Sequence, residues 1–192
     1  MPTYADSLSL HDARRVYFDA NAFGADGGYA KRWIKVKLGP VPIWFPNSAG
    51  RVRAVRYHDL HHVATGYDTD LVGEGEIGAW EVASGCRGFV AAWVLNLLAM
   101  VLGSAISPAR LFGAFVRGRH SRNLYGEPFD DALLASSVGA LRQRLGLAGA
   151  PPTPTGADRA AFVAWFAVAL CTYVLVSVIV LTPLALLVTW LL

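Results

Sequence analysis

The feature that most limits how this chain can fold is a C-terminal run, Ala160 to Leu192, that contains no charged side chain. A straight helix of this length extends about 48 Å at 1.5 Å per residue, whereas the hydrocarbon core of a bilayer is ~30 Å thick. A domain of 192 residues could hardly bury such a run. We therefore expect one membrane-spanning helix, from about Ala161 to Leu181, with Pro183 kinking or ending it before a short apolar tail.

The orientation of that helix follows from the basic side chains. Lysines and arginines precede the run and none follows it, so the positive-inside rule predicts that the body of the protein lies on the cytoplasmic face. A tight re-entrant pair of helices is the alternative arrangement. In either case we expect the C-terminus to be a membrane anchor.

A second uncharged stretch, from Gly88 to Ile106, is also about long enough to cross a bilayer. Asn96 lies in its middle, and arginines flank it on both sides, so a single crossing would leave one basic cluster on the wrong side of the membrane. We expect this stretch to form a buried or interfacial helix instead.

Composition narrows the class of protein. Hydrophobic residues make up 54% of the chain and charged residues only 16%, so the chain is more apolar than a typical soluble globular protein. The net charge of +3 is too small for the electrostatic footprint of a nucleic-acid-binding protein. Cys86 and Cys171 lie far apart and form neither a disulfide framework nor a zinc-knuckle spacing, which suits a reducing compartment.

Residues 33–45 predict a small β-hairpin. Apolar residues alternate with Lys35 and Lys37, which is the period of a strand, and Gly39-Pro40 can turn the chain. Pro42 cannot donate to a ladder and therefore suits an edge strand. Two interpretations stay open: a hairpin packed on the helical core, or an apolar hairpin that touches a membrane or covers a lipid groove.

The other periodic stretches are helical, which makes the predicted fold class mainly α. A short helix is expected over 12–18, another begins at Pro108, and an apolar stripe predicts a single amphipathic helix over 128–147. The predicted organisation is a helical bundle with a metal site between two helices in residues 1–147, a proline-rich linker at 148–159 and a membrane anchor at 160–192.

The metal site is predicted from a cluster of histidines and acids. In a helix, His58 and His62 lie one turn apart on one face, and Asp59 lies about 100° round from His58, so the three can converge. Eleven residues then lead to Glu74, which is room for a turn and the start of a second helix. Two imidazoles and two carboxylates suit a divalent metal that prefers nitrogen and oxygen. His61, at the edge of this arc, is expected to support the ligands or to lie on the surface.

These residues resemble a known family. The pattern His58-Asp59-x-x-His62, eleven residues, then Glu74 is similar to the metal-ligand signature of the ubiquinone (coenzyme Q) biosynthesis family COQ-four. The sequence similarity covers about residues 55–86, and a weaker similarity continues to Leu145. Neighbouring residues agree with the family as well: Gly66, Thr69, Gly73, Trp80, Glu81, Ser84 and Gly85.

The resemblance implies a function. Members of that family are helical proteins of a membrane face, needed to make ubiquinone, which bind a divalent metal and hold a prenylated aromatic precursor. They are credited with organising other biosynthetic enzymes and with replacing the ring carboxyl at carbon one by hydroxyl in an oxidative decarboxylation. Their groove for the prenyl tail corresponds to residues 88–106 here. Known members attach peripherally, so the C-terminal anchor is a departure.

Carried over residue by residue, the resemblance implies His58, Asp59, His62 and Glu74 as metal ligands. Glu81, two turns below Glu74 on an otherwise apolar face, is the candidate catalytic or supporting residue. Zinc is the expected metal, with iron, manganese and magnesium left open. The expected partners are membrane lipid, a prenylated quinone precursor, other quinone-biosynthesis proteins and a second copy of the chain, and no nucleic acid.

Two functions from other classes compete with this one. A non-catalytic lipid-binding scaffold with a structural metal fits the same residues, because four protein ligands can close a site, so whether the protein is an enzyme stays open. A membrane histidine-box oxygenase or desaturase needs several histidine boxes. This chain has five histidines, of which His11 and His120 stand alone, and that argues against such an enzyme.

Overall fold

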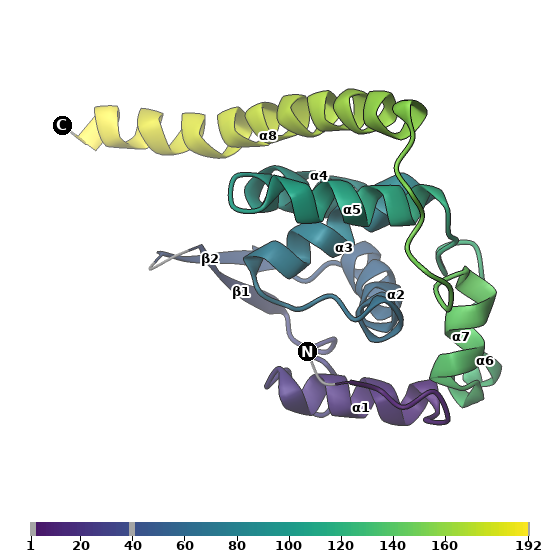
Figure 1. The fold of residues 1–192 in the computed structure, drawn as a ribbon. Helices are drawn as coiled ribbons and strands as arrows, with labels where there is room; N and C mark the ends of the chain where they lie inside the picture. The colour runs from purple at the N-terminus through teal and green to yellow at the C-terminus, as the bar shows by residue number, and fades with distance from the viewer. Residues whose placement is uncertain (1–2, 39–40, 192) are drawn as a thin grey trace.

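The computed structural model describes residues 3–38 and 41–191 (Figure 1). Within these residues the protein is mainly helical with one two-stranded antiparallel hairpin, which confirms the predicted fold class. The turn predicted at Gly39-Pro40 lies outside the described residues. The elements are, in order, α1 (Leu10–Ala20), β1 (Trp33–Leu38), β2 (Val41–Pro46), α2 (Ala49–Thr65), α3 (Leu71–Ser84), α4 (Val90–Ser104), α5 (Pro108–Arg119), α6 (Asp131–Ala135), α7 (Val138–Leu145) and α8 (Gly156–Leu191).

The helices are stacked in layers. In Figure 1, α8 lies over α4 and α5, α3 and α2 lie beneath them, and α1 closes the opposite side. The largest buried side chains, including Trp80, Phe115 and Tyr17, fill the space between these layers. The predicted metal-ligand residues lie on α2 and α3, in the middle of the stack.

The turn between α2 and α3 is fixed by capping residues. α2 ends at Gly66, whose left-handed conformation (φ 79°) favours glycine, and its N–H donates to the carbonyl of His62. α3 begins after Asp70, whose carboxylate accepts a hydrogen bond from the N–H of Gly73. This short connection brings Glu74, in the first turn of α3, back beside the last turns of α2.

Glycines let α3 approach its neighbours closely. A β-carbon added at Gly75 would lie 2.9 Å from the α-carbon of Gly103 on α4. A β-carbon added at Gly118 on α5 would lie 2.4 Å from the carbonyl oxygen of Trp80 on α3. Because backbone atoms cannot move aside as a flexible side chain can, these crossings depend on the missing side chain.

Gly118→Ala should therefore destabilise the protein. We expect a loss of about 2 kcal/mol, which corresponds to roughly 4–8 °C in Tm for a chain of this size, because α5 must move away from α3. Gly113→Ala is the matched control on the same helix, where an added β-carbon meets nothing within 4 Å. Alanine should stabilise that position by up to ~1 kcal/mol. Thermal unfolding of both variants in detergent measures the difference, and equal Tm values would contradict a close α3–α5 crossing.

The predicted hairpin is present, and its two tryptophans face outward. β1 and β2 pair antiparallel, with Lys35 opposite Trp44 and Trp33 opposite Pro46. Trp33 is 51% exposed and Trp44 is 58% exposed. One interpretation of the sequence was a hairpin packed on the helical core. At these two positions the hairpin does not pack on the core.

The stretch predicted as one amphipathic helix over 128–147 is two helices, and that prediction was wrong. Ser136 and Ser137 both have extended backbone and separate α6 from α7. The Ser137 hydroxyl accepts from the N–H of Ala140 and caps α7, while the Ser136 carbonyl accepts from the N–H of Leu10. Serine at a helix start competes with a continuous helix because its side chain replaces a backbone acceptor.

The uncharged stretch after Gly88 forms α4. With 15 residues, α4 is shorter than the roughly 20 residues that a spanning helix needs. Met100 is fully buried in α4 and Asn96 nearly so, while Leu95 is exposed. α4 is thus a partly buried helix, as the flanking arginines predicted.

The C-terminal helix α8 is one continuous element. It begins at Gly156, within the predicted linker, and its α-helical conformation passes through Pro183 rather than ending there. Its first half packs on α4 and α5: the rings of Trp93 and Trp165 stack with centroids 5.2 Å apart, and Phe162 lies edge-on to Phe115. Asp158, in the first turn, accepts a hydrogen bond from Arg119 at 2.6 Å.

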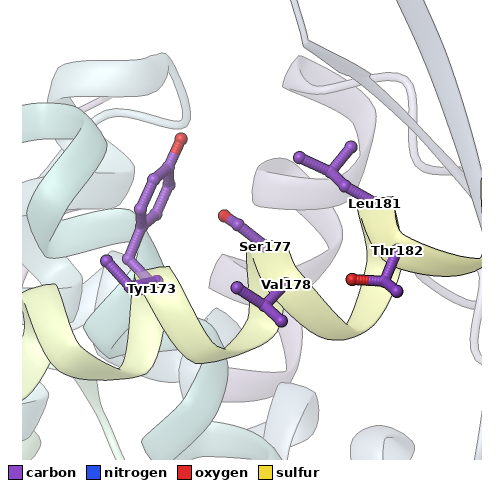
Figure 2. Close-up of a pocket in the computed structure, with 6 residues that line it drawn as sticks. Tyr173, Ser177, Val178, Leu181 and Thr182 are labelled. Atoms are coloured by element: carbon purple, nitrogen blue, oxygen red, sulfur yellow. The ribbon is translucent and has the colours of Figure 1, made fainter. Parts of the chain in front are cut away.

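The rest of α8 extends beyond the body. Val174, Val178 and Ile179 are all more than half exposed, and Figure 2 shows Tyr173 and Ser177 beside a shallow depression lined by α8 alone. Within the segment Gly156–Pro183, a window of 18 residues has a mean hydropathy of 2.5, and the segment is long and apolar enough to cross a membrane.

Candidate metal centre

Three of the predicted ligand residues come together between α2 and α3. The Nε2 atoms of His58 and His62 lie 3.1 Å apart. One carboxylate oxygen of Glu74 lies 3.4 Å from His58 Nε2, and the other lies 3.6 Å from His62 Nε2. Ligand atoms about 2.0–2.2 Å from a tetrahedral ion lie roughly 3.4 Å from one another. The three side chains thus have the spacing of a zinc-like site.

Hydrogen bonds fix which ring nitrogens face the cluster. The Nδ1 atom of His62 lies 2.9 Å from the carbonyl oxygen of Tyr67, which only accepts, so Nδ1 carries the proton. The Nδ1 atom of His58 lies 3.0 Å from Oε1 of Glu81 and donates to it. When both rings are neutral, each Nε2 lone pair therefore points into the cluster, toward Glu74. Two lone pairs and a carboxylate at this separation require a positive charge between them, which a metal ion or a proton can supply.

Glu81 lies beneath His58 rather than at the opening of the site. Its side chain is fully buried and its carboxylate accepts from four groups. These donors are His58 Nδ1 at 3.0 Å, His61 Nδ1 at 2.7 Å, the Tyr125 hydroxyl at 2.6 Å and the Asn96 amide. A carboxylate that holds the far nitrogen of a ligating histidine fixes the ring and raises its basicity. Glu81 is therefore placed as a positioning residue for His58.

His61 is part of the same support. Its Nε2 accepts from the N–H of Leu124 at 2.9 Å, so its Nδ1 must be the donor to Glu81. Both ring nitrogens are thus occupied and the side chain is fully buried. His61 supports the site and has no nitrogen free to bind a metal.

The pKa values reflect this arrangement. Burial acts to lower the pKa of His58, but the charges of Glu81 and Glu74 outweigh it and hold that pKa well above its usual value. Burial lowers the pKa of His62 to about 4. Burial acts to raise the pKa of Glu81, yet His58 and His61 hold it well below its usual range. A proton on His58 therefore supplies the positive charge when no metal does.

Asp59 is placed apart from the other three candidates. Its carboxylate is buried and accepts a hydrogen bond from the Tyr29 hydroxyl. Burial raises the pKa of Asp59 to about 6. One residue further along a helix is about 100° round the axis, and here that rotation turns Asp59 toward the glycine-rich loop that carries Tyr29. Asp59 as a ligand stays a prediction.

The cluster is open on one side. The His62 side chain is fully buried and stacks on the ring of Tyr17, with centroids 5.6 Å apart. The side chain of His58 is 18% exposed and that of Glu74 is 37% exposed. A metal ion held by these three side chains would have a coordination position on the accessible side for water or substrate.

Several supporting residues were not foreseen from the sequence. Tyr29 and Tyr125 lie in loops distant along the chain from Asp59 and Glu81, with which they form hydrogen bonds. Tyr67 lies only five residues after His62, but it contributes its backbone carbonyl, which a side-chain pattern does not reveal. Asn96 gave a signal, because a single amide in the middle of an apolar helix needs a buried partner, and Glu81 is that partner.

These observations define a class: a mainly helical protein with a two-histidine, one-carboxylate centre and an apolar C-terminal helix. No family model matches the sequence, and no curated protein or solved structure is significantly similar to it.

Proposed function

We propose that this protein is a membrane-anchored metalloprotein of ubiquinone biosynthesis, acting on a prenylated aromatic precursor at the His58–His62–Glu74 cluster. The observation that carries the proposal is the convergence of three ligand atoms with fixed tautomers and one accessible side. Their order and spacing along the chain are those of the resembling family's signature. The resemblance supplies the substrate class.

The donor set fits a divalent metal. Two imidazole nitrogens and one carboxylate suit zinc, and also iron, manganese or magnesium to differing degrees. A bound metal supplies Lewis acidity toward the carboxylate and phenol oxygens of the head group. The protein's own residues do the rest: Glu81 and the Tyr67 carbonyl orient the two imidazoles, and Tyr17 shields His62 from water. Oxidative decarboxylation also needs an oxidant such as dioxygen, which favours a redox metal.

Exposed apolar side chains at the two ends of α4 support this helix as the contact for the isoprenoid tail. Val90 is 72% exposed and Ile106, just beyond the helix, is 57% exposed. α4 contacts the first half of α8 through Trp93 and Trp165, so a tail on this surface lies next to the proposed anchor. The basic residues that precede α8 support a cytoplasmic location of the body under the positive-inside rule.

A structural metal in a lipid-binding scaffold is the second candidate. The observation that favours it is that His58 and His62 come from α2 while Glu74 comes from α3, so a metal joins two helices. A histidine-box oxygenase is not proposed. Within the described chain, His61 is occupied on both nitrogens, His120 lies beside Asp158 and His11 beside Asp12.

A complementation experiment distinguishes the catalyst from the scaffold with a structural metal. Glu74→Ala and His58→Ala are expressed in a host that lacks its own ring-decarboxylating step, with Glu127→Ala as a half-buried control in the loop before α6. For a catalyst, we expect both variants to fold and reach the membrane while precursors carrying the ring carboxyl accumulate. Intact ubiquinone synthesis by both variants contradicts catalysis at this site. Metal analysis of the purified protein and mass measurement of co-purifying lipid identify the ligands directly.

A further inference from the structure

Charge is distributed very unevenly along this chain. The segment from Gly27 to His58 contains seven of the 17 Lys and Arg residues and none of the 14 Asp and Glu residues. The remainder of the chain therefore has a net negative charge although the whole chain is at +3. The hairpin lies in the middle of this basic segment.

One face of the hairpin combines this charge with exposed aromatic rings. Residues directly opposite in an antiparallel pair share a face, which puts Trp33, Lys35, Trp44 and Pro46 together. All four are exposed, and the Lys35 ammonium lies 5.2 Å from the centre of the Trp44 ring. Both tryptophan side chains have more than half of their surface exposed to water, which is unfavourable unless another surface covers them.

The hairpin is firmly attached at its base to the helix that carries the histidines. The Asn47 amide donates to the carbonyls of Gly28, Tyr29 and Lys31. Its oxygen accepts from Arg51 on α2 at 2.8 Å, and the Arg51 guanidinium lies over the Phe45 ring. Whatever holds the outer face of the hairpin therefore also sets the orientation of α2.

We propose that the face formed by Trp33, Lys35, Trp44 and Pro46 docks on an anionic bilayer surface, with the indole rings at the level of the lipid headgroups. Tryptophan is enriched at membrane interfaces because its ring is apolar and its N–H is polar. Each basic residue near an anionic leaflet strengthens attachment about fivefold. Figure 1 shows the hairpin and the free half of α8 projecting from the body in the same direction, so both reach one bilayer. This docking is independent of the metal and of the proposed reaction.

The test places an environment-sensitive NBD label at Trp44→Cys in the full-length chain carrying Cys171→Ser, reconstituted in nanodiscs. Cys86 is buried and stays unlabelled, and Val16→Cys on α1, 42% exposed, is the matched control. Nanodiscs contain either phosphatidylcholine alone or phosphatidylcholine with 30% phosphatidylglycerol, and a shallow doxyl-labelled lipid is the quencher. We expect at least twofold stronger quenching at position 44 than at position 16, with the difference largest in the anionic discs.

Two further outcomes complete the test. The charge-reversed pair Arg32→Glu and Lys35→Glu, added to the labelled chain, should bring quenching at position 44 close to that of position 16 in anionic discs. The proposal is overturned if the label at position 44 stays as accessible to aqueous iodide as the control in both kinds of disc. It is also overturned if the label is shielded only at high protein concentration, which would assign the face to a second copy of the chain.

Discussion

A variant in which His62 is replaced by Ala is expected to bind a divalent metal at least about 100-fold more weakly than the native chain. Structural zinc sites contribute about 10–16 kcal/mol of binding free energy, so each ligand accounts for roughly 3 kcal/mol. The Nε2 atom of His62 lies 3.1 Å from His58 Nε2 and 3.6 Å from a carboxylate oxygen of Glu74, so it is one of the three ligand atoms that converge. Competition with a chromophoric chelator measures the affinity, and metal content by mass spectrometry gives the stoichiometry.

Asp59→Asn is the informative comparison for that experiment. Asn is nearly isosteric and can still accept from the Tyr29 hydroxyl, so the fold is preserved. If His58, His62 and Glu74 are the ligands, Asp59→Asn should keep its metal affinity within about threefold, because the Asp59 carboxylate contacts Tyr29. A loss as large as that of His62→Ala would show that Asp59 turns to complete a four-ligand site. If His62→Ala itself binds the metal with native affinity, the proposed metal centre is wrong.

Glu81→Leu is expected to prevent folding or to reduce stability by more than about 4 kcal/mol. The substitution leaves the ring N–H of His61, the Tyr125 hydroxyl and the Asn96 amide buried without an acceptor, and each such group costs about 1–3 kcal/mol. Proteins of this kind are stable by only about 5–15 kcal/mol in total. Chemical denaturation followed by circular dichroism measures the effect.

Glu81→Gln keeps the variant series interpretable if Glu81→Leu does not fold. Its amide oxygen still accepts from both histidines, so the fold should persist, while the negative charge behind His58 is lost. Removing such a supporting carboxylate typically weakens metal binding 10- to 100-fold. Glu127→Gln, at the partly exposed ion pair with Arg144, is the control and should cost less than ~1 kcal/mol. A metal affinity unchanged in Glu81→Gln contradicts its positioning role.

The part of the site that is local in sequence was predictable. His58 and His62 meet because a helix repeats every 3.6 residues, and Glu74 follows after one capped turn, whose Gly66 and Asp70 are recognisable from sequence. The direction of Asp59 was not predictable, because it depends on Tyr29, thirty residues earlier in a loop. The same holds for Glu81, whose partners Asn96 and Tyr125 come from two other segments.

The fold was predictable where the pattern was strong. The alternation around Lys35 predicted the hairpin, and the long apolar C-terminus predicted α8. Over 128–147 the apolar stripe had the right period for one helix, but the capping preference of Ser137 divided it. Pro183 did not end α8, since a proline in a helix removes only one hydrogen bond and the chain around it continues in helical conformation.

The unbroken course of α8 has a mechanical consequence. Its first half belongs to the body through Trp165 and Phe162, while its second half is free, with no loop between them to act as a swivel. A domain on a flexible tether samples all tilts above a bilayer, whereas here any tilt of the body must bend the rod or separate the stacked indoles of Trp93 and Trp165. A bilayer that takes up the free half would thus hold the cluster on α2 and α3 at a constant height. Encounter with a lipid-borne molecule then becomes a search in two dimensions.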